Sequence, residues 1–309
     1  MRARLALGAA LLFALGAPPA PRALAQDAAP LKVCMAENNP PLSYRVASEM
    51  RGLDARLARA IAAELGRPLA AVPFESKFDR DTSLTYEVNA LLSSGVCELA
   101  SGFPLLAPDL GAPMRARAKA PDYPGAAPIR QRPAVALGTL VPSRAYHASV
   151  MGVVLRDASR QVDKLADLKP LRVGMIAGTM ASAALMLYRN GMLRPSLVSL
   201  SQHDDLLAAL DAGQFDAALV PLNKFDAYRL AHPQTRLAAA HYVHPLRVNL
   251  GLVALDGAPQ LIAAANRVIE RALANGELER WARDAGATWA RPSLPDVGAP
   301  FSFGALIDD

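Results

Sequence analysis

The 309-residue sequence is poor in cysteine, histidine and aromatic residues, and it lacks a hydrophobic run long enough to cross a membrane. A membrane-spanning helix requires about 20 apolar residues, and no run in the sequence reaches that length. No stripe of aromatic and basic residues is present, so nucleic-acid binding is not expected. A Gly-x-Ser-x-Gly motif is missing as well, and no serine stands in a recognisable triad setting. These absences argue against a membrane protein, a nucleic-acid-binding protein and a serine hydrolase.

The first 25 residues have the pattern of an export signal. Arg2 and Arg4 precede an apolar run over residues 5–15, and a small-x-small sequence ends at Ala25. We expect cleavage after Ala25 and a periplasmic mature protein that begins at Gln26. The apolar run is too short for a membrane anchor, and no cysteine follows it to accept a lipid.

Cys34 and Cys97 are the only two cysteines. In an oxidising compartment they can form a disulfide, which is the preferred interpretation. The alternative is two buried thiols that pack as small hydrophobic side chains. A bond requires the two Cα atoms to lie within about 7 Å, and in the chain-entropy model it would contribute about 4 kcal/mol.

The first half of the sequence alternates strand-like and helix-like segments. Short apolar runs indicate strands, and apolar residues at helical spacing indicate helices. The expected strands are residues 31–36, 69–74 and 97–103, and the expected helices are 53–65 and 85–95. This βαβαβ order predicts a parallel sheet with right-handed crossovers. The pattern then stops, because residues 104–142 hold eight prolines, which indicates either an ordered insertion that covers the lobe or a flexible surface excursion.

The second half resumes the α/β pattern. Its expected strands are 146–156, 171–176, 215–220 and 248–257, and its expected helices are 180–188, 203–212 and one long amphipathic helix over 259–286. Asp204 and Asp205 stand near the start of the second of these helices, where capping is their preferred role.

Seven segments in order, among them "LKVCMAENNPPLSY", "LLSSGVCELASGF" and "LRVGMIAGTMASAAL", resemble the family 3 periplasmic solute-binding proteins of ABC importers. The resemblance implies an α/β protein with the type II periplasmic binding fold, in which two α/β lobes are joined by a two-strand hinge. Lobe 1 would comprise residues 26–147 and 246–309, including the proline-rich insertion at about 104–142. Lobe 2 would comprise residues 148–245, and the protein is expected to be a monomer.

Ligands of open α/β sheets gather beyond the carboxyl ends of the strands, so the resemblance places the cleft there. The cleft residues expected from lobe 1 are Glu37, Asn38, Pro41, Leu42, Tyr44, Ser101, Gly102, Phe103 and Tyr146. Those expected from lobe 2 are Gly178, Thr179, Met180 and Pro221. The backbone N–H groups after Gly178 could face an anion; equally, Thr179 could simply cap a tight turn.

Two departures from the family pattern concern the charged anchors for an amino acid. The Thr-x-x-Arg segment that usually follows the glycine of the third strand is missing after Gly102, and Pro221 stands where an acid usually binds the ligand ammonium. A buried charge without its partner is costly, so an ordinary amino acid is not the expected ligand. Apolar residues stand at these positions instead, which favours a small apolar ligand or a protein segment.

Within the family, the long proline-rich excursion and the missing anchors resemble the accessory proteins MoxJ and XoxJ, which are encoded with PQQ-dependent methanol dehydrogenases. This resemblance implies a non-enzymatic periplasmic helper in maturation or activation, with the dehydrogenase as partner. The alternative is the substrate-binding subunit of an ABC importer, with a permease as partner. No cofactor or catalytic residue is expected. No metal is expected either, because His241 and His244 would point to opposite faces of a strand.

Overall fold

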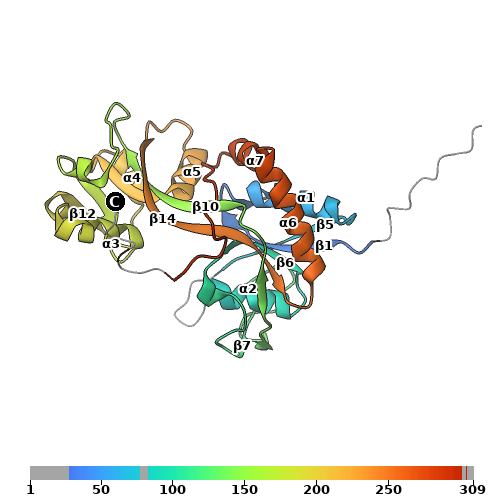
Figure 1. The fold of residues 1–309 in the computed structure, drawn as a ribbon. Coiled ribbons are helices and arrows are strands. Elements are labelled where there is room, and N and C mark those ends of the chain that lie inside the picture. The colour runs from blue at the N-terminus through green and yellow to red at the C-terminus, as the bar shows by residue number, and fades with distance from the viewer. Residues whose placement is uncertain (1–27, 77–82, 301–303, 305–309) are drawn as a thin grey trace, which may run out of the picture.

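The computed structural model describes residues 28–76, 83–300 and 304; the predicted signal sequence lies outside them. Two α/β lobes stand side by side, and two long strands, β10 (His147–Leu155) and β14 (Ala238–Leu255), run from one into the other (Figure 1). The predicted lobe boundaries at 147/148 and 245/246 fall at the start of β10 and within β14, and they stay predictions. A two-lobed α/β architecture with a two-strand connection is what the sequence predicts.

One mixed sheet passes through both lobes, in the order β12-β11-β13-β10-β14-β6-β1-β5, and β9 pairs with β14 at its side. The strands of lobe 1 are β1 (Leu31–Ala36), β5 (Leu69–Phe74), β6 (Leu99–Pro104) and β9 (Leu140–Pro142). Those of lobe 2 are β11 (Val173–Ile176), β12 (Leu197–Leu200) and β13 (Ala217–Pro221). Three short strands form a separate sheet, namely β2 (Asn38–Asn39), β3 (Ser43–Val46) and β4 (Glu49–Arg51).

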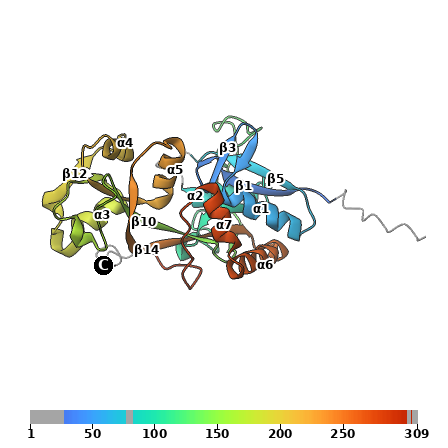
Figure 2. The same cartoon turned by 90° about the horizontal axis from the view of Figure 1, so that it is seen from above.

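Helices cover the sheet of each lobe, as the view from above shows (Figure 2). Lobe 1 has α1 (Leu53–Glu64), α2 (Leu84–Ser93), α6 (Pro259–Ala274) and α7 (Glu277–Ala285). Lobe 2 has α3 (Met180–Leu187), α4 (Leu206–Asp211) and α5 (Leu222–Ala231). The single long helix expected over 259–286 is wrong, because Gly276 takes a left-handed conformation with φ 73° and separates α6 from α7.

The turn after β1 docks on the first turn of α1. The carbonyl of Leu42 accepts a hydrogen bond from the Asp54 N–H at 2.9 Å, which satisfies one of the helix's unpaired donors. Gly52 makes this approach possible: its φ is 104°, and a Cβ there would lie 2.3 Å from the Leu42 oxygen. The peptide bond between Pro40 and Pro41 is cis. The polar turn therefore helps to start a helix as well as to border the cleft.

The proline-rich segment is folded onto lobe 1. Its short strands β7 (Arg117–Ala118) and β8 (Val135–Ala136) pair with each other. Arg132 is 9% exposed and donates hydrogen bonds to the carbonyls of Ala120 and Pro121 at 2.9 and 2.6 Å. An arginine inside the segment thus satisfies backbone groups that a loop would otherwise leave unpaired.

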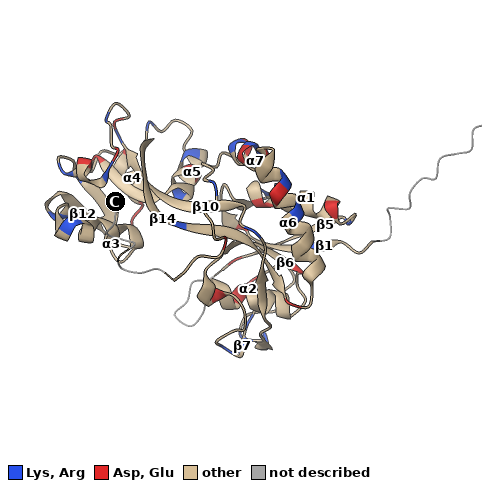
Figure 3. Ribbon diagram, in the orientation of Figure 1, with Lys and Arg blue, Asp and Glu red and all other residues tan. Residues whose placement is uncertain are grey.

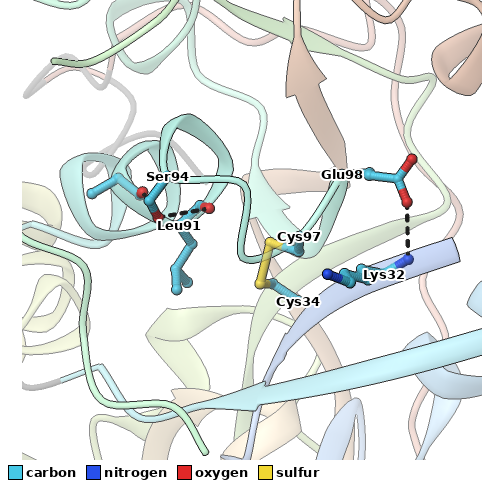
Figure 4. Close-up of a disulfide and its surroundings, with 7 residues drawn as sticks. Lys32, Cys34, Leu91, Ser94, Cys97 and Glu98 are labelled. Carbon is cyan, nitrogen blue, oxygen red and sulfur yellow. Dashed lines mark hydrogen bonds between the residues drawn. A yellow bond between two sulfur atoms is a disulfide. The ribbon is translucent and has the colours of Figure 1, made fainter. Parts of the chain in front are cut away.

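A disulfide joins Cys34 in β1 to Cys97, which stands just before β6 (Figure 4). The two Cα atoms are 5.7 Å apart, and β1 and β6 pair in parallel with Cys34 opposite Ala100. Both cysteines are buried in the same apolar cluster. The predicted disulfide is therefore confirmed, because the βαβαβ order brings the first and third strands together.

The C-terminal segment after α7, residues 287–300, lies across the two connecting strands. The Trp289 Nε1–H donates to the carbonyl of Tyr146 at 3.2 Å, and the Ala148 N–H donates to the carbonyl of Ala290 at 3.0 Å. The Asn249 side-chain amide donates to the carbonyls of Ser293, Pro295 and Asp296. The segment is thus bound to both β10 and β14.

Charged residues of both signs are dispersed over both lobes (Figure 3). Of the helices in the part of the chain that the structure describes, none is long and apolar enough to cross a membrane.

Candidate functional site

A cavity of about 530 Å³ lies between the lobes, at the carboxyl ends of the lobe 1 strands. Lobe 1 supplies the ends of β1, β5 and β6 together with α2, and lobe 2 supplies Lys224 of α5. The lining residues are Ala36, Asn38, Asn39, Ser43, Phe74, Glu75, Ser76, Leu84, Val88, Ser101, Gly102, Phe103 and Lys224. Beside it the Asn223 amide donates a hydrogen bond to Asn39 Oδ1 at 3.4 Å, so the two lobes also meet directly.

A second cavity, of about 910 Å³, lies against lobe 2 and the connecting strands. Its surface is mostly aliphatic, with Val150, Ile176, Met180, Leu246 and Val248 among the lining residues. Polar and charged side chains also reach it, namely those of Ser149, Thr179, Gln202, Asp204, Asp205, Lys224, Tyr228 and His232. Polar and apolar groups of lobe 1 thus line the cavity between the lobes together, and the cavity against lobe 2 is the more apolar of the two.

The structure places the residues predicted for the cleft in three groups. Residues that line a cavity are Asn38, Ser101, Gly102, Phe103, Thr179, Met180 and Pro221. Glu37, Tyr44 and Gly178 lie near the cavities without lining them, and Glu37 pairs with Arg45 at 3.0 Å. Pro41, Leu42 and Tyr146 are buried and line neither cavity, so their place in the cleft stays a prediction. They are buried because the turn docks on α1 and because the Tyr146 hydroxyl is engaged inside lobe 1.

Thr179 caps α3, as the simpler of the two interpretations of this corner predicts. Its hydroxyl accepts a hydrogen bond from the Ser182 N–H, and its own N–H donates to the Ser182 hydroxyl, each at 3.1 Å. These bonds form a reciprocal capping box. The Thr179 N–H is therefore already used within the helix start.

A buried carboxylate supports the lobe 1 wall from behind. Asp54 is 1% exposed and accepts hydrogen bonds from the Tyr146 hydroxyl at 2.6 Å and the Ser101 hydroxyl at 3.0 Å. The Gly102 N–H in turn donates to the Tyr146 oxygen at 3.1 Å. Burial raises the pKa of Asp54 to about 6, although the two hydrogen bonds oppose the rise. The same burial, with the nearby carboxylate, raises the pKa of Tyr146.

The raised pKa of Asp54 predicts a pH-dependent stability. The folded protein keeps the proton between the ordinary pKa of 3.8 and about 6, where the unfolded chain has released it. The stabilisation of the folded state by protonated Asp54 is therefore complete below about pH 4, decreases as the pH rises to about 6, and is absent above that pH. We expect the free energy of unfolding of the wild type, relative to Asp54→Asn, to fall by about 3 kcal/mol between about pH 4 and pH 7.

Urea unfolding of both proteins across this range measures the effect. Tyr146→Phe serves as a second variant: it removes a hydrogen bond that lowers the pKa of Asp54, so it should move the pH dependence to higher pH. If the free energies of unfolding of the wild type and Asp54→Asn differ by the same amount at every pH in this range, the raised pKa of Asp54 is contradicted.

Lys224, Asn39 and Glu75 also line the cavity between the lobes, although no sequence motif marks them. Lys224 stands three residues after Pro221, in the first turn of α5. A cation is unfavourable in the first turn of a helix, and this unusual position is the sequence signal that could have identified Lys224 as a site residue. Of the two histidines once considered for a metal, His241 is exposed and His244 is buried. Among the residues that the structure describes, no group of three or more His, Cys, Asp or Glu side chains could hold a metal ion.

Solved structures with the type II periplasmic binding fold match this chain over most of its length, and the likeness establishes that fold for it. No protein-family model and no curated protein matches the sequence.

The second substrate-binding domain of GlnP from Lactococcus lactis, in an open conformation, has a TM-score of 0.59 and 16% identity over 82% of this chain and 94% of its own. The unliganded, open L-cystine solute receptor of Neisseria gonorrhoeae has a TM-score of 0.58 and 16% identity over 85% and 97%. The second substrate-binding domain of a putative amino acid ABC transporter from Streptococcus pneumoniae has a TM-score of 0.59 and 17% identity over 84% and 100%.

Proposed function

We propose that this chain is the solute-binding subunit of an ABC importer for a small organic solute. The observation that carries the proposal is the cavity of about 530 Å³ lined from both lobes, which lies within the usual size range of small-molecule sites. The fold is shared with a substrate-binding domain of GlnP and with an L-cystine solute receptor. The proposed partner is an ABC permease, the proposed location is the periplasm, and the chain has no enzymatic role.

The helper role for a PQQ-dependent methanol dehydrogenase has less support. It requires a wide, apolar cleft without convergent charged groups, whereas Lys224 and Glu75 line the same cavity here. The neighbours in the structural comparison are substrate-binding domains and solute receptors. Copurification of a dehydrogenase with the protein would favour the helper role and count against the importer.

A thermal-shift screen of small organic solutes on the mature protein tests the importer role. A bound solute stabilises the folded state by RT ln(1 + [L]/Kd), about 2.7 kcal/mol at a hundredfold excess over Kd. We expect at least one solute to raise Tm in this concentration-dependent manner. We also expect Asn38→Trp, which places a large side chain at the cavity, to abolish the rise.

Gln260→Trp is the matched control, because Gln260 is an exposed amide on α6 that lines neither cavity. It should keep the full stabilisation. A screen without any stabilising solute, or equal stabilisation of wild type and Asn38→Trp, would contradict a solute site between the lobes.

A further inference from the structure

Lys224 is the one described residue that lines both the cavity between the lobes and the cavity against lobe 2. It is an exposed residue of α5, third after the cap residue Pro221, so it comes from lobe 2 and stands where the two cavities meet. Among the described residues its ammonium forms no ion pair within 4.0 Å. A cation is therefore available at the centre of the site.

The position of Lys224 in α5 is electrostatically unfavourable for the helix itself. The N-terminal turn carries the positive end of the helix dipole, where acidic residues stabilise and cations do not. The first turn of α5 contains no acidic residue that would offset the lysine. The lysine and the N-terminal end of α5 are thus two positive features at the same place in the cleft, and both favour an anion beside Lys224.

The two acidic residues that line the lobe 2 cavity, Asp204 and Asp205, accept hydrogen bonds from backbone N–H groups. Asp205 caps α4 by accepting hydrogen bonds from the Leu207 and Ala208 N–H groups at 3.1 and 3.0 Å. Asp204 accepts from the Ser201 N–H at 2.7 Å, and the hydrogen bonds from Ser201 lower the pKa of Asp204. Their carboxylates are held at the loop before α4, so they have a structural role independent of Lys224.

We propose, on the basis of the importer role above, that the solute is an organic carboxylate whose anionic group binds Lys224 and whose apolar part enters the lobe 2 cavity. The cavity is large enough, at about 910 Å³, for an extended hydrocarbon body. Met180, which lines it and is 41% exposed, is a flexible side chain that adapts to different shapes. The residue that binds the anionic group is then in lobe 2. In the family pattern this role belongs to an arginine of lobe 1, which this chain lacks.

Calorimetric titration with matched probes tests the proposal. One series contains straight-chain and phenyl-substituted carboxylates of about four to ten carbons, and the second contains their uncharged amides. We expect carboxylates to bind the mature wild-type protein about tenfold or more tightly than the amides, because a charge-assisted hydrogen bond to the ammonium is lost in the amide. This preference should decrease from about 20 mM to about 500 mM NaCl, since the ion pair is accessible to solvent.

Lys224→Met should remove the preference by weakening carboxylate binding to the level of the amides, and Lys224→Arg should keep it. Lys169→Met is the matched control, because Lys169 is an exposed lobe 2 lysine that lines neither cavity. Amino acids with the same side chains form a third series. If they bind the wild type more tightly than the plain carboxylates, and Glu75→Gln loses this gain, the solute is a zwitterion whose carboxylate binds Lys224 and whose ammonium binds Glu75.

The two possible failures are distinguishable. If wild type and Lys224→Met bind carboxylates equally well, or if amides bind as tightly as carboxylates, the carboxylate proposal is overturned while the importer role stands. If neither series nor the wider thermal-shift screen yields a ligand, the importer role fails as well.

Discussion

Replacing both Cys34 and Cys97 by alanine is expected to lower the free energy of unfolding by about 4 kcal/mol. The bond closes a loop with a sequence separation of 63, and its removal gives the unfolded chain back the corresponding loop entropy. Both residues are buried, at 0% and 2% exposure, so the loss of packed sulfur atoms acts in the same direction. The bond joins the middle of β1 to the residue just before β6, and both strands end at the cavity between the lobes.

Denaturant unfolding of the oxidised wild type, the reduced wild type and the double alanine variant separates these contributions. Reduction alone should account for most of the decrease, because it restores loop entropy without removing atoms. The same reductant added to the double variant is the control and should change nothing. Equal stability of the oxidised and reduced wild type would contradict a stabilising bond.

The sequence predicts the elements of lobe 1 well because their signals are local. The strands Leu31–Ala36 and Leu69–Phe74 have the predicted bounds, since each is a short apolar run next to turn residues or prolines. Because the βαβαβ order pairs the first and third strands in parallel, it also brings Cys34 and Cys97 close together. The break at Gly276 also had a local signal, an Asn-Gly pair inside an otherwise continuous helical pattern.

The side-chain network behind the cleft could not be predicted in the same manner. Asp54 and Tyr146 are 92 positions apart and meet only because the residue just before β10 reaches the first turn of α1. No periodicity or motif links them, so a tyrosine at the end of a loop was predicted to face the cleft. Lys224 and Glu75 are a similar case, since their common cavity depends on how the two lobes face each other.

The second large effect is expected at Asp226, a carboxylate of α5 that is 1% exposed. It accepts hydrogen bonds from the Thr288 N–H at 2.6 Å, the Thr288 hydroxyl at 2.8 Å and Arg229 at 2.6 Å. Thr288 is the second residue of the C-terminal segment that crosses β10 and β14, so this contact joins lobe 2 to lobe 1. We expect Asp226→Ala to lower the free energy of unfolding by about 4 kcal/mol, because three hydrogen-bond donors lose their buried, charged acceptor.

Denaturant unfolding measures this effect, and Asp284→Ala is the matched control. Asp284 also pairs with an arginine, Arg56 at 2.7 Å, but its side chain is 56% exposed, so its loss should cost less than about 1 kcal/mol. Combining Asp226→Ala with Thr288→Val should cost clearly less than the sum of the single changes, because both remove the same hydrogen bond. If the losses of unfolding free energy in the two single variants add up in the double variant, Asp226 stabilises α5 independently of Thr288. The non-additive result would make α5, which also carries Lys224, an element whose position depends on the C-terminal segment.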